Sequence, residues 1–194
     1  MRVCLIPLCI EARKPSTNIQ RFRQRLEEAT PYAPDLICLP ECAFTGYLYE
    51  SHDLERYAEP IPGDTTTTIA ELAGAFRCSI CFGMPEHTPE SWYSSGVLID
   101  PSSRIALVQR KMSEQIPFMA GDHIRVLSTE FGRLAILLCG DLFEEEARRQ
   151  AARAEIVIVP LTRSFDGLSP TGNAGCVKSA RHTPMQSEAL EQQR

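Results

Sequence analysis

Residues 35–47 read DLICLPECAFTGY, in which a short apolar run leads directly into a polar loop. The run at 36–39 has the length and composition of a buried β-strand, and Pro40 ends it because proline cannot donate a ladder hydrogen bond. Glu41 therefore follows the end of a strand, where the sheet fixes a side chain and the loop opens it to substrate. On position alone, a glutamate there is more often a solvated loop carboxylate, so the rest of the chain has to support a functional role.

Short apolar runs alternate with amphipathic segments on both sides of this stretch, a pattern typical of a layered α+β domain. Apolar runs predict strands at residues 3–8, 36–39, 78–84, 97–100, 105–111, 124–127, 134–139 and 156–160. Helical spacing of apolar residues predicts helices at residues 16–30, 65–76 and 144–154. Thr17 with Gln20 has the form of a capping box, and Asp64 is placed to cap the second helix. The turn residues 101–103 predict a hairpin between two strands, so we expect mixed sheets.

Composition narrows the class of protein. The chain has 194 residues, a formal net charge of −5 and 43% hydrophobic residues, which is typical of one globular domain with a core. It carries no block of basic residues, so neither nucleic acid nor a membrane surface is an expected partner. No apolar stretch has the form of a signal peptide or a membrane span. Most of the eight cysteines lie inside apolar runs, as free thiols do in a reducing compartment, and the expected location is the cytoplasm.

Three of the predicted strands lead into reactive side chains, namely Glu41, Lys111 and Cys139. Each alone has an ordinary structural explanation, but as a set they fit nucleophilic catalysis. A cysteine attacks as the thiolate, and it needs a base or a cationic neighbour to reach that form. Glu41 supplies a base and Lys111 a cation, whereas the four histidines lie in polar segments without a shared context. The set therefore favours a Glu-Lys-Cys site over a Cys-His arrangement.

The same residues carry a resemblance to the nitrilase, or carbon–nitrogen hydrolase, superfamily. Residues 35–47 resemble its glutamate motif, Arg110-Lys111 is similar to its lysine motif, and Cys139-Gly-Asp141 resembles its cysteine motif. Glu114 and the residues downstream of it are similar to the stretch that carries the family's second glutamate. The motifs occur in the family's order, and the resemblance covers residues 1 to about 165.

The resemblance implies a fold and a chain organisation. It implies a four-layer αββα sandwich with mixed sheets, built as a single domain over residues 1–194, and a homo-oligomer that is a dimer or a higher assembly. The motifs lie within residues 1–165, whereas residues 166–194 are expected to form a loop and a partial helix. The family's C-terminal segment is expected to be missing, because the family continues beyond the point at which this chain stops. We therefore expect a shortened gene product or a fragment of a longer enzyme.

The resemblance also implies roles for the site residues. Cys139 would attack the substrate carbon, and Glu41 would accept the thiol proton and later return one. Lys111, together with the backbone N–H of Gly140, would hold the developing oxyanion. Glu114 is expected to support catalysis by orienting Lys111 and the substrate amine.

The implied function is hydrolysis of a non-peptide C–N bond in a small linear amide or carbamoyl compound, with ammonia released through a cysteine thioester acyl-enzyme. Tyr47 and Phe118 are expected to contact the substrate, and neither a metal nor an organic cofactor is expected. Two alternatives stay open. The chain could be a catalytically weak or inactive nitrilase-like module kept for binding or assembly, or the glutaminase part of an amidotransferase. The intact set of three reactive side chains favours the enzyme, whereas the short tail favours the module.

Overall fold

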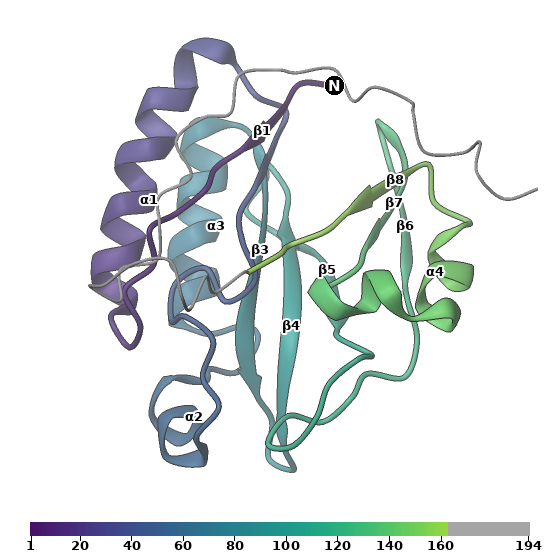
Figure 1. Ribbon diagram of the computed structural model, residues 1–194. Helices are drawn as coiled ribbons and strands as arrows, with labels where there is room; N and C mark the ends of the chain where they lie inside the picture. The colour runs from purple at the N-terminus through teal and green to yellow at the C-terminus, as the bar shows by residue number, and fades with distance from the viewer. Residues whose placement is uncertain (163–194) are drawn as a thin grey trace, which may run out of the picture.

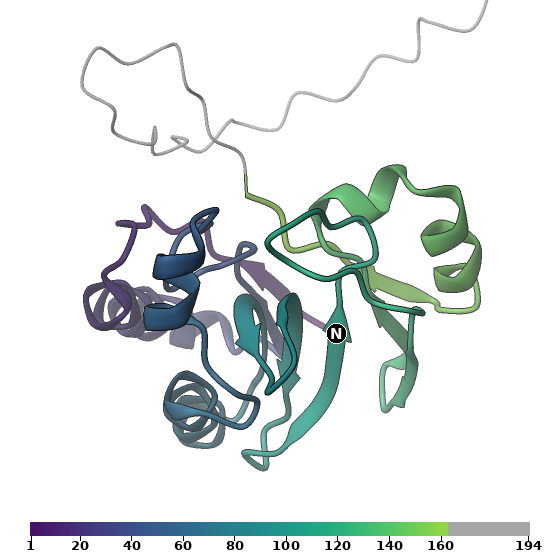
Figure 2. The same cartoon turned by 90° about the horizontal axis from the view of Figure 1, so that it is seen from below.

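The computed structural model describes residues 1–162, which form two β-sheets packed face to face with helices on both outer sides (Figure 1). Helices α1 (Pro15–Ala29) and α3 (Asp64–Phe76) cover one sheet, and α4 (Glu145–Ala151) lies outside the other. The view from below separates the same layers, with the purple and blue helices on one side and the green helix on the other (Figure 2). The predicted αββα sandwich is therefore confirmed. The loop and partial helix predicted for residues 166–194 lie outside the described residues.

The first sheet has five strands in the order of the sequence. They are β1 (Val3–Leu5), β2 (Leu36–Cys38), β3 (Ser79–His87), β4 (Trp92–Ile99) and β5 (Ile105–Arg110). The first three are parallel, and β4 and β5 are added antiparallel, which confirms both the predicted hairpin and the mixed sheet. Two reversals of direction make β5 parallel to β2, so the residues after β2 and β5 emerge at the same edge.

The second sheet has three strands, β6 (Val126–Thr129), β7 (Gly132–Ile136) and β8 (Ile156–Ile158). β6 pairs antiparallel with β7, and β7 pairs parallel with β8. The strand expected at 134–139 ends at Ile136, although the N–H of Leu137 still donates to the carbonyl of Ile158 at 2.9 Å. The chain then turns into a 3-10 helix, η2 (Cys139–Phe143), so Cys139 lies at a turn that follows the strand.

The caps predicted for the first two helices, Thr17 and Asp64, are wrong, and one helix was not predicted. Helix α1 begins at Pro15 with Lys14 as N-cap and no side-chain cap, because proline already has the backbone angle of a first helical residue. Gly63, not Asp64, caps α3, and its N–H donates to the hydroxyl of Thr66 at 2.8 Å. The helix that was not predicted is α2 (Ser51–Tyr57), whose 7 residues are too few to show helical periodicity. A 3-10 turn, η1 (Thr30–Tyr32), follows α1.

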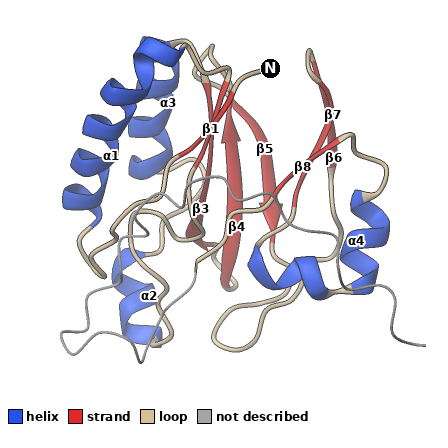
Figure 3. Ribbon diagram, turned by 45° about the horizontal axis from the view of Figure 1, so that its top comes forward, coloured by secondary structure: helices blue, strands red, loops and turns tan. Residues whose placement is uncertain are grey.

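The pleat of the first sheet divides the core into two sides, as the alternation of side chains along a strand requires. Ile37 and Ile80 face α1 and α3, where they meet Phe22 of α1 in a buried cluster. Cys81 faces the other way and packs against Leu138 between the two sheets. Helices and strands thus occupy separate layers when they are coloured by type (Figure 3). Within residues 1–162, no helix combines the length and hydropathy needed to span a bilayer.

Candidate active site

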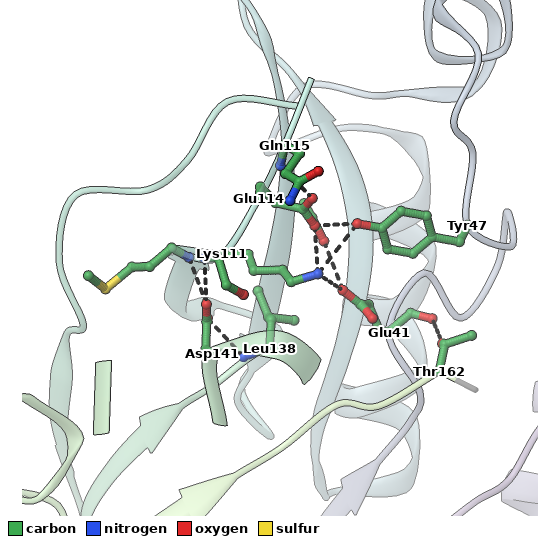
Figure 4. A network of polar contacts seen from close by, with 11 residues as sticks. Glu41, Tyr47, Lys111, Glu114, Gln115, Leu138, Asp141 and Thr162 are labelled. Carbon is green, nitrogen blue, oxygen red and sulfur yellow. Dashed lines mark hydrogen bonds and ion pairs between the residues drawn. The ribbon is translucent and has the colours of Figure 1, made fainter. Parts of the chain in front are cut away.

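Glu41, Lys111 and Cys139 meet at the edge of the sandwich where β2, β5 and β7 end. The Nζ of Lys111 lies 3.0 Å from Oε1 of Glu41, and the Cys139 thiol lies close enough to the Glu41 carboxylate for each group to shift the pKa of the other. Lys111 also forms an ion pair with Glu114, at 2.7 Å between Nζ and Oε1. Figure 4 shows the ammonium between the two carboxylates. The structure therefore brings together the residues that the sequence placed far apart.

Lys111 is held as a buried ammonium. Its residue is only 7% exposed, and burial on its own would lower the pKa of the amine. The hydrogen bonds and the charges of Glu114 and Glu41 outweigh burial and raise the pKa of Lys111 above its ordinary value. Its hydrogen-bond partners are those two carboxylates and, at 3.4 Å, the hydroxyl of Tyr47. Lys111 thus carries a fixed positive charge with a defined direction.

Glu41 is buried beside the Cys139 thiol, at 1% exposure. Burial raises the pKa of its carboxyl, and the neighbouring Lys111 charge partly opposes that shift. The hydroxyl of Ser94 donates to its Oε1 at 3.4 Å, and the hydroxyl of Thr162 donates to its main-chain carbonyl. A carboxylate with a raised pKa beside a thiol is suited to take up the thiol proton.

Cys139 is the first residue of η2 and has a strained backbone conformation. Its φ of +42° lies in the left-handed region, which non-glycine residues seldom adopt and which is often found at functional sites. Its N–H donates to the carbonyl of Pro160 at 3.0 Å, which fixes the turn against the chain that follows β8. Burial and the Glu41 charge raise the pKa of the thiol, opposed by Lys111, so the resting side chain is the protonated thiol.

Gly140 lies against the lysine. A Cβ at this position would be 2.6 Å from the Oγ of Ser113 and 3.6 Å from the Cε of Lys111, so only glycine fits without moving the serine. The main chain of residue 140 therefore runs beside the Lys111 side chain. This closeness supports the expected pairing of the Gly140 N–H with Lys111 as oxyanion donors, which stays a prediction.

Glu114 and Tyr47 support Lys111 from the side opposite Glu41. The hydroxyl of Tyr47 donates to Oε1 of Glu114, the same oxygen that pairs with Lys111. Phe118 is 2% exposed and packs edge-on against the Tyr47 ring, with centroids 5.7 Å apart. Glu114 thus lies where the sequence predicted a supporting residue. Tyr47 has its hydroxyl engaged and Phe118 lies behind its ring, so direct substrate contact by either stays a prediction.

Two residues at this edge received no role from the sequence. Asp141 is fully buried and accepts hydrogen bonds from main-chain groups on both sides of the site. Thr162 reaches Glu41 across 121 residues, and nothing in its surroundings in the sequence signals that contact. Asp141 could have been found, since it lies two residues after Cys139. Among residues 1–162, no three His, Cys, Asp or Glu side chains are grouped so that they could hold a metal ion.

Gly83 of β3 allows the main chain at Glu41 to lie close against the sheet. A Cβ there would lie 2.8 Å from the Cα of Glu41 and 2.9 Å from the main-chain nitrogen of Cys42, both of which are backbone atoms. Gly83→Ala should therefore push the Glu41 turn outward, lower the free energy of unfolding by about 1–3 kcal/mol and reduce activity. Thermal unfolding and ammonia release would measure both effects.

Gly74→Ala in α3 is the matched control for that variant. Its added Cβ would meet only the rotatable hydroxyl of Ser103, and alanine favours the helix. It should retain activity. A Gly83→Ala protein with unchanged stability and activity would contradict the argument that close approach positions Glu41.

Comparisons with known proteins identify relatives of this chain. A hydrolase from the pqqF 5' region of Pseudomonas protegens is 32% identical over 169 residues, which cover 82% of this chain and 59% of that protein. A nitrilase from Pyrococcus abyssi is 27% identical over 165 residues, covering 81% of this chain and 63% of that protein. The chain thus spans about three fifths of the length of these relatives.

Solved structures of amidases share the fold. The crystal structure of an N-terminal amidase superposes with a TM-score of 0.73 at 20% identity, over 82% of this chain and 47% of that one. A mutant amidase from Nesterenkonia sp. AN1, with acrylamide added to its active-site cysteine, gives a TM-score of 0.71 at 21% identity, over 86% and 69% of the two chains. The family model described as carbon-nitrogen hydrolase matches residues 2–193. With this match over nearly its whole length, the chain belongs to the carbon-nitrogen hydrolase family of the nitrilase superfamily.

Proposed function

We propose that the chain hydrolyses the C–N bond of a small linear amide or carbamoyl compound, with Cys139 as nucleophile, Glu41 as base and acid, and Lys111 as oxyanion holder. One observation carries this proposal. The Lys111 ammonium lies between the buried carboxylates of Glu41 and Glu114, and the Cys139 thiol lies close enough to Glu41 for that carboxylate to raise the pKa of the thiol. Relatives named as an (R)-stereoselective amidase from a Pseudomonas species and an omega-amidase from Homo sapiens support the same reaction class.

The first half of the reaction forms a thioester and releases ammonia. Glu41 takes the thiol proton as the sulfur of Cys139 bonds to the carbonyl carbon, and the carbonyl oxygen becomes an oxyanion. The negative charge thereby moves from Glu41 to the substrate oxygen. Lys111 is already hydrogen-bonded to Glu41, so a neutral Glu41 leaves that N–H available for the oxyanion. The tetrahedral intermediate then collapses, the C–N bond breaks, and Glu41 returns its proton to the departing nitrogen.

The second half consumes water. Glu41, again a carboxylate, removes a proton from a water molecule whose oxygen bonds to the thioester carbon. The new oxyanion takes the same place beside Lys111, for a stabilisation of about 3–4 kcal/mol per donor in comparable sites. The C–S bond then breaks, the acid leaves, and Glu41 gives the proton back to the sulfur. Atoms and charges balance without any further reagent.

Two features argue against an inactive binding module. The acidic and basic groups form one connected network beside the nucleophilic thiol, and Lys111 is 7% exposed. Burying a lysine between carboxylates costs desolvation, which a binding surface does not require. A network of this kind is typical of sites where perturbed pKa values serve catalysis.

Ammonia release tests the proposed function. The 194-residue chain would be incubated with short aliphatic amides, carbamoyl compounds, glutamine and nitriles, and ammonia and the acid product would be measured together. We expect ammonia and acid in equal amounts from at least one linear amide or carbamoyl compound. Turnover of glutamine alone would favour the amidotransferase alternative. A folded protein that releases no ammonia from any compound would refute the proposal.

The pH dependence should report on Glu41. The base must be ionised to accept the thiol proton, so kcat/KM should fall as the pH drops through the pKa of Glu41. Burial raises that pKa from its ordinary value of 4.5, which places the acid limb of the profile above the range of a solvated glutamate. Glu41→Gln should abolish most of the activity and remove this limb from the residual rate. An acid limb that persists in Glu41→Gln would assign the base to another group.

A further inference from the structure

The carboxylate of Asp141 connects the segment that follows Lys111 with the segment that precedes Cys139. Oδ1 accepts the main-chain N–H groups of Met112 at 2.9 Å and Ser113 at 2.8 Å. Oδ2 accepts the N–H of Leu138 at 3.1 Å. The side chain has no exposed surface, and Figure 4 shows it between the Lys111 strand end and Leu138. One buried carboxylate therefore accepts hydrogen bonds from three main-chain N–H groups, which belong to two different segments.

These segments carry the lysine and the cysteine. Met112 and Ser113 directly follow Lys111, where the chain leaves β5 of the five-stranded sheet. Leu138 directly precedes Cys139, where the chain leaves the three-stranded sheet after β7. Asp141 itself lies in η2, so its hydrogen bonds span the gap between the sheets. Any change in these bonds would alter how far the Lys111 backbone lies from the Cys139 turn.

The contacts require a carboxylate. An ionised aspartate only accepts hydrogen bonds, and here all three partners donate. Within the described residues no ion pair involves Asp141, and the three hydrogen bonds of its carboxylate are all donated by main-chain N–H groups. Asparagine has the same shape but one of its two terminal groups is a donor. It would turn that donor toward a main-chain N–H on one side, either Leu138 or Met112 and Ser113.

We propose that Asp141 is a positioning residue for the reaction, which sets the separation between the Cys139 sulfur and the Lys111 ammonium. This inference rests on the proposed function. Asp141 does not touch the reacting atoms; it acts through the backbone of the residues beside Lys111 and Cys139. Displacements of about 1 Å in such a site reduce rates by roughly 100-fold, because the oxyanion donors act only at the correct distance.

Asp141→Asn is the first test, with turnover expressed per titratable Cys139. We expect kcat to fall at least about tenfold while KM changes less than about twofold, since the affected contacts are made in the transition state. Hydrogen exchange at the amides of Met112, Ser113 and Leu138 should accelerate. Asp100→Asn is the matched control. Asp100 also accepts hydrogen bonds from main-chain N–H groups, those of Ser102 and Arg104, but it lies in the turn between β4 and β5. It should leave kcat unchanged.

Iodoacetamide alkylation of Cys139 gives a readout that does not depend on turnover. Moving Lys111 away from the sulfur removes a charge that lowers the pKa of the thiol, so the midpoint of alkylation against pH should shift upward in Asp141→Asn. If Asp141→Asn does not fold, Asp141→Glu keeps both acceptor oxygens but lengthens the side chain by one methylene. That variant should fold and show the same loss of kcat and the same shift.

The outcomes separate this inference from the proposed function. An unchanged kcat per Cys139 together with an unchanged alkylation midpoint would overturn the positioning role. Unchanged hydrogen exchange at the three amides would show that the bonds do not hold these segments in solution, and would overturn it as well. If the unmodified protein releases no ammonia from any compound, the proposed function fails. The alkylation and exchange results then still decide whether Asp141 sets the geometry.

Discussion

Replacement of Cys139 by alanine is expected to abolish ammonia release, with a loss of about 10⁴-fold or more, as removal of the nucleophile does in comparable enzymes. The sulfur supplies the bond that replaces the C–N bond, and no neighbouring group can substitute for it. Folding should be nearly unaffected. Cysteine and alanine both carry a Cβ, so the strain at φ +42° is the same in both proteins. The thermal midpoint and the ammonia rate would be measured on the same preparations.

Cys9→Ala is the matched control for this variant. Cys9 is exposed, whereas Cys139 is half-buried at the end of the sandwich. It should keep full activity, which separates loss of one thiol from general sensitivity to cysteine substitution. If Cys139→Ala kept more than a few per cent of the activity, a different residue would have to be the nucleophile.

Lys111→Met is expected to have the second largest effect, a loss of about 10³-fold in kcat with a clear loss of stability. The oxyanion would lose its charged donor. Glu41 and Glu114 would also face each other without the ammonium that pairs with both. Removing one partner of a buried ion pair costs about 3–5 kcal/mol, because the remaining charge stays buried. The Glu41 pKa should rise further, since the Lys111 charge now opposes its shift.

Kinetics and thermal unfolding would be compared with those of Lys14→Met. Lys14 is a surface lysine paired with Glu11 at 3.0 Å, and pairs of this kind contribute little to stability. That control should be indistinguishable from the unmodified protein. A Lys111→Met protein with normal turnover would remove Lys111 from the mechanism, and one with normal stability would contradict the balance of charges described for the site.

The fold could be predicted from the sequence where burial decides the structure. Apolar runs such as residues 78–84 and 97–100 mark strands because the strands are covered on both faces. They coincide with most of β3 and with the end of β4, which begins earlier, at Trp92. The first residues of the helices could not be predicted with the same precision. The predicted starts at residues 16 and 65 each lie one position after the observed starts at Pro15 and Asp64, and proline or a glycine backbone can replace a side-chain cap. The arrangement of the layers came from the family resemblance.

The candidate site could be predicted only in part, for a related reason. Glu41 and Lys111 lie 70 residues apart, yet each follows a strand, and strand ends meet at one edge of a sheet. Their burial could not be predicted, because a lysine after a strand is usually solvated. Asp141 and Thr162 act on main-chain groups of distant segments. Such contacts depend on how two sheets pack, which local sequence does not specify.

The most direct test of the central claim is a covalent adduct on Cys139. The chain would be mixed with a substrate amide, quenched in acid during turnover, and examined by intact mass and peptide mapping. We predict an added mass equal to the amide minus ammonia, located on Cys139 and absent from Cys139→Ala, which disappears as the acid product forms. Ammonia release with no adduct at any time, or an adduct on another cysteine that decays at the rate of turnover, would contradict it.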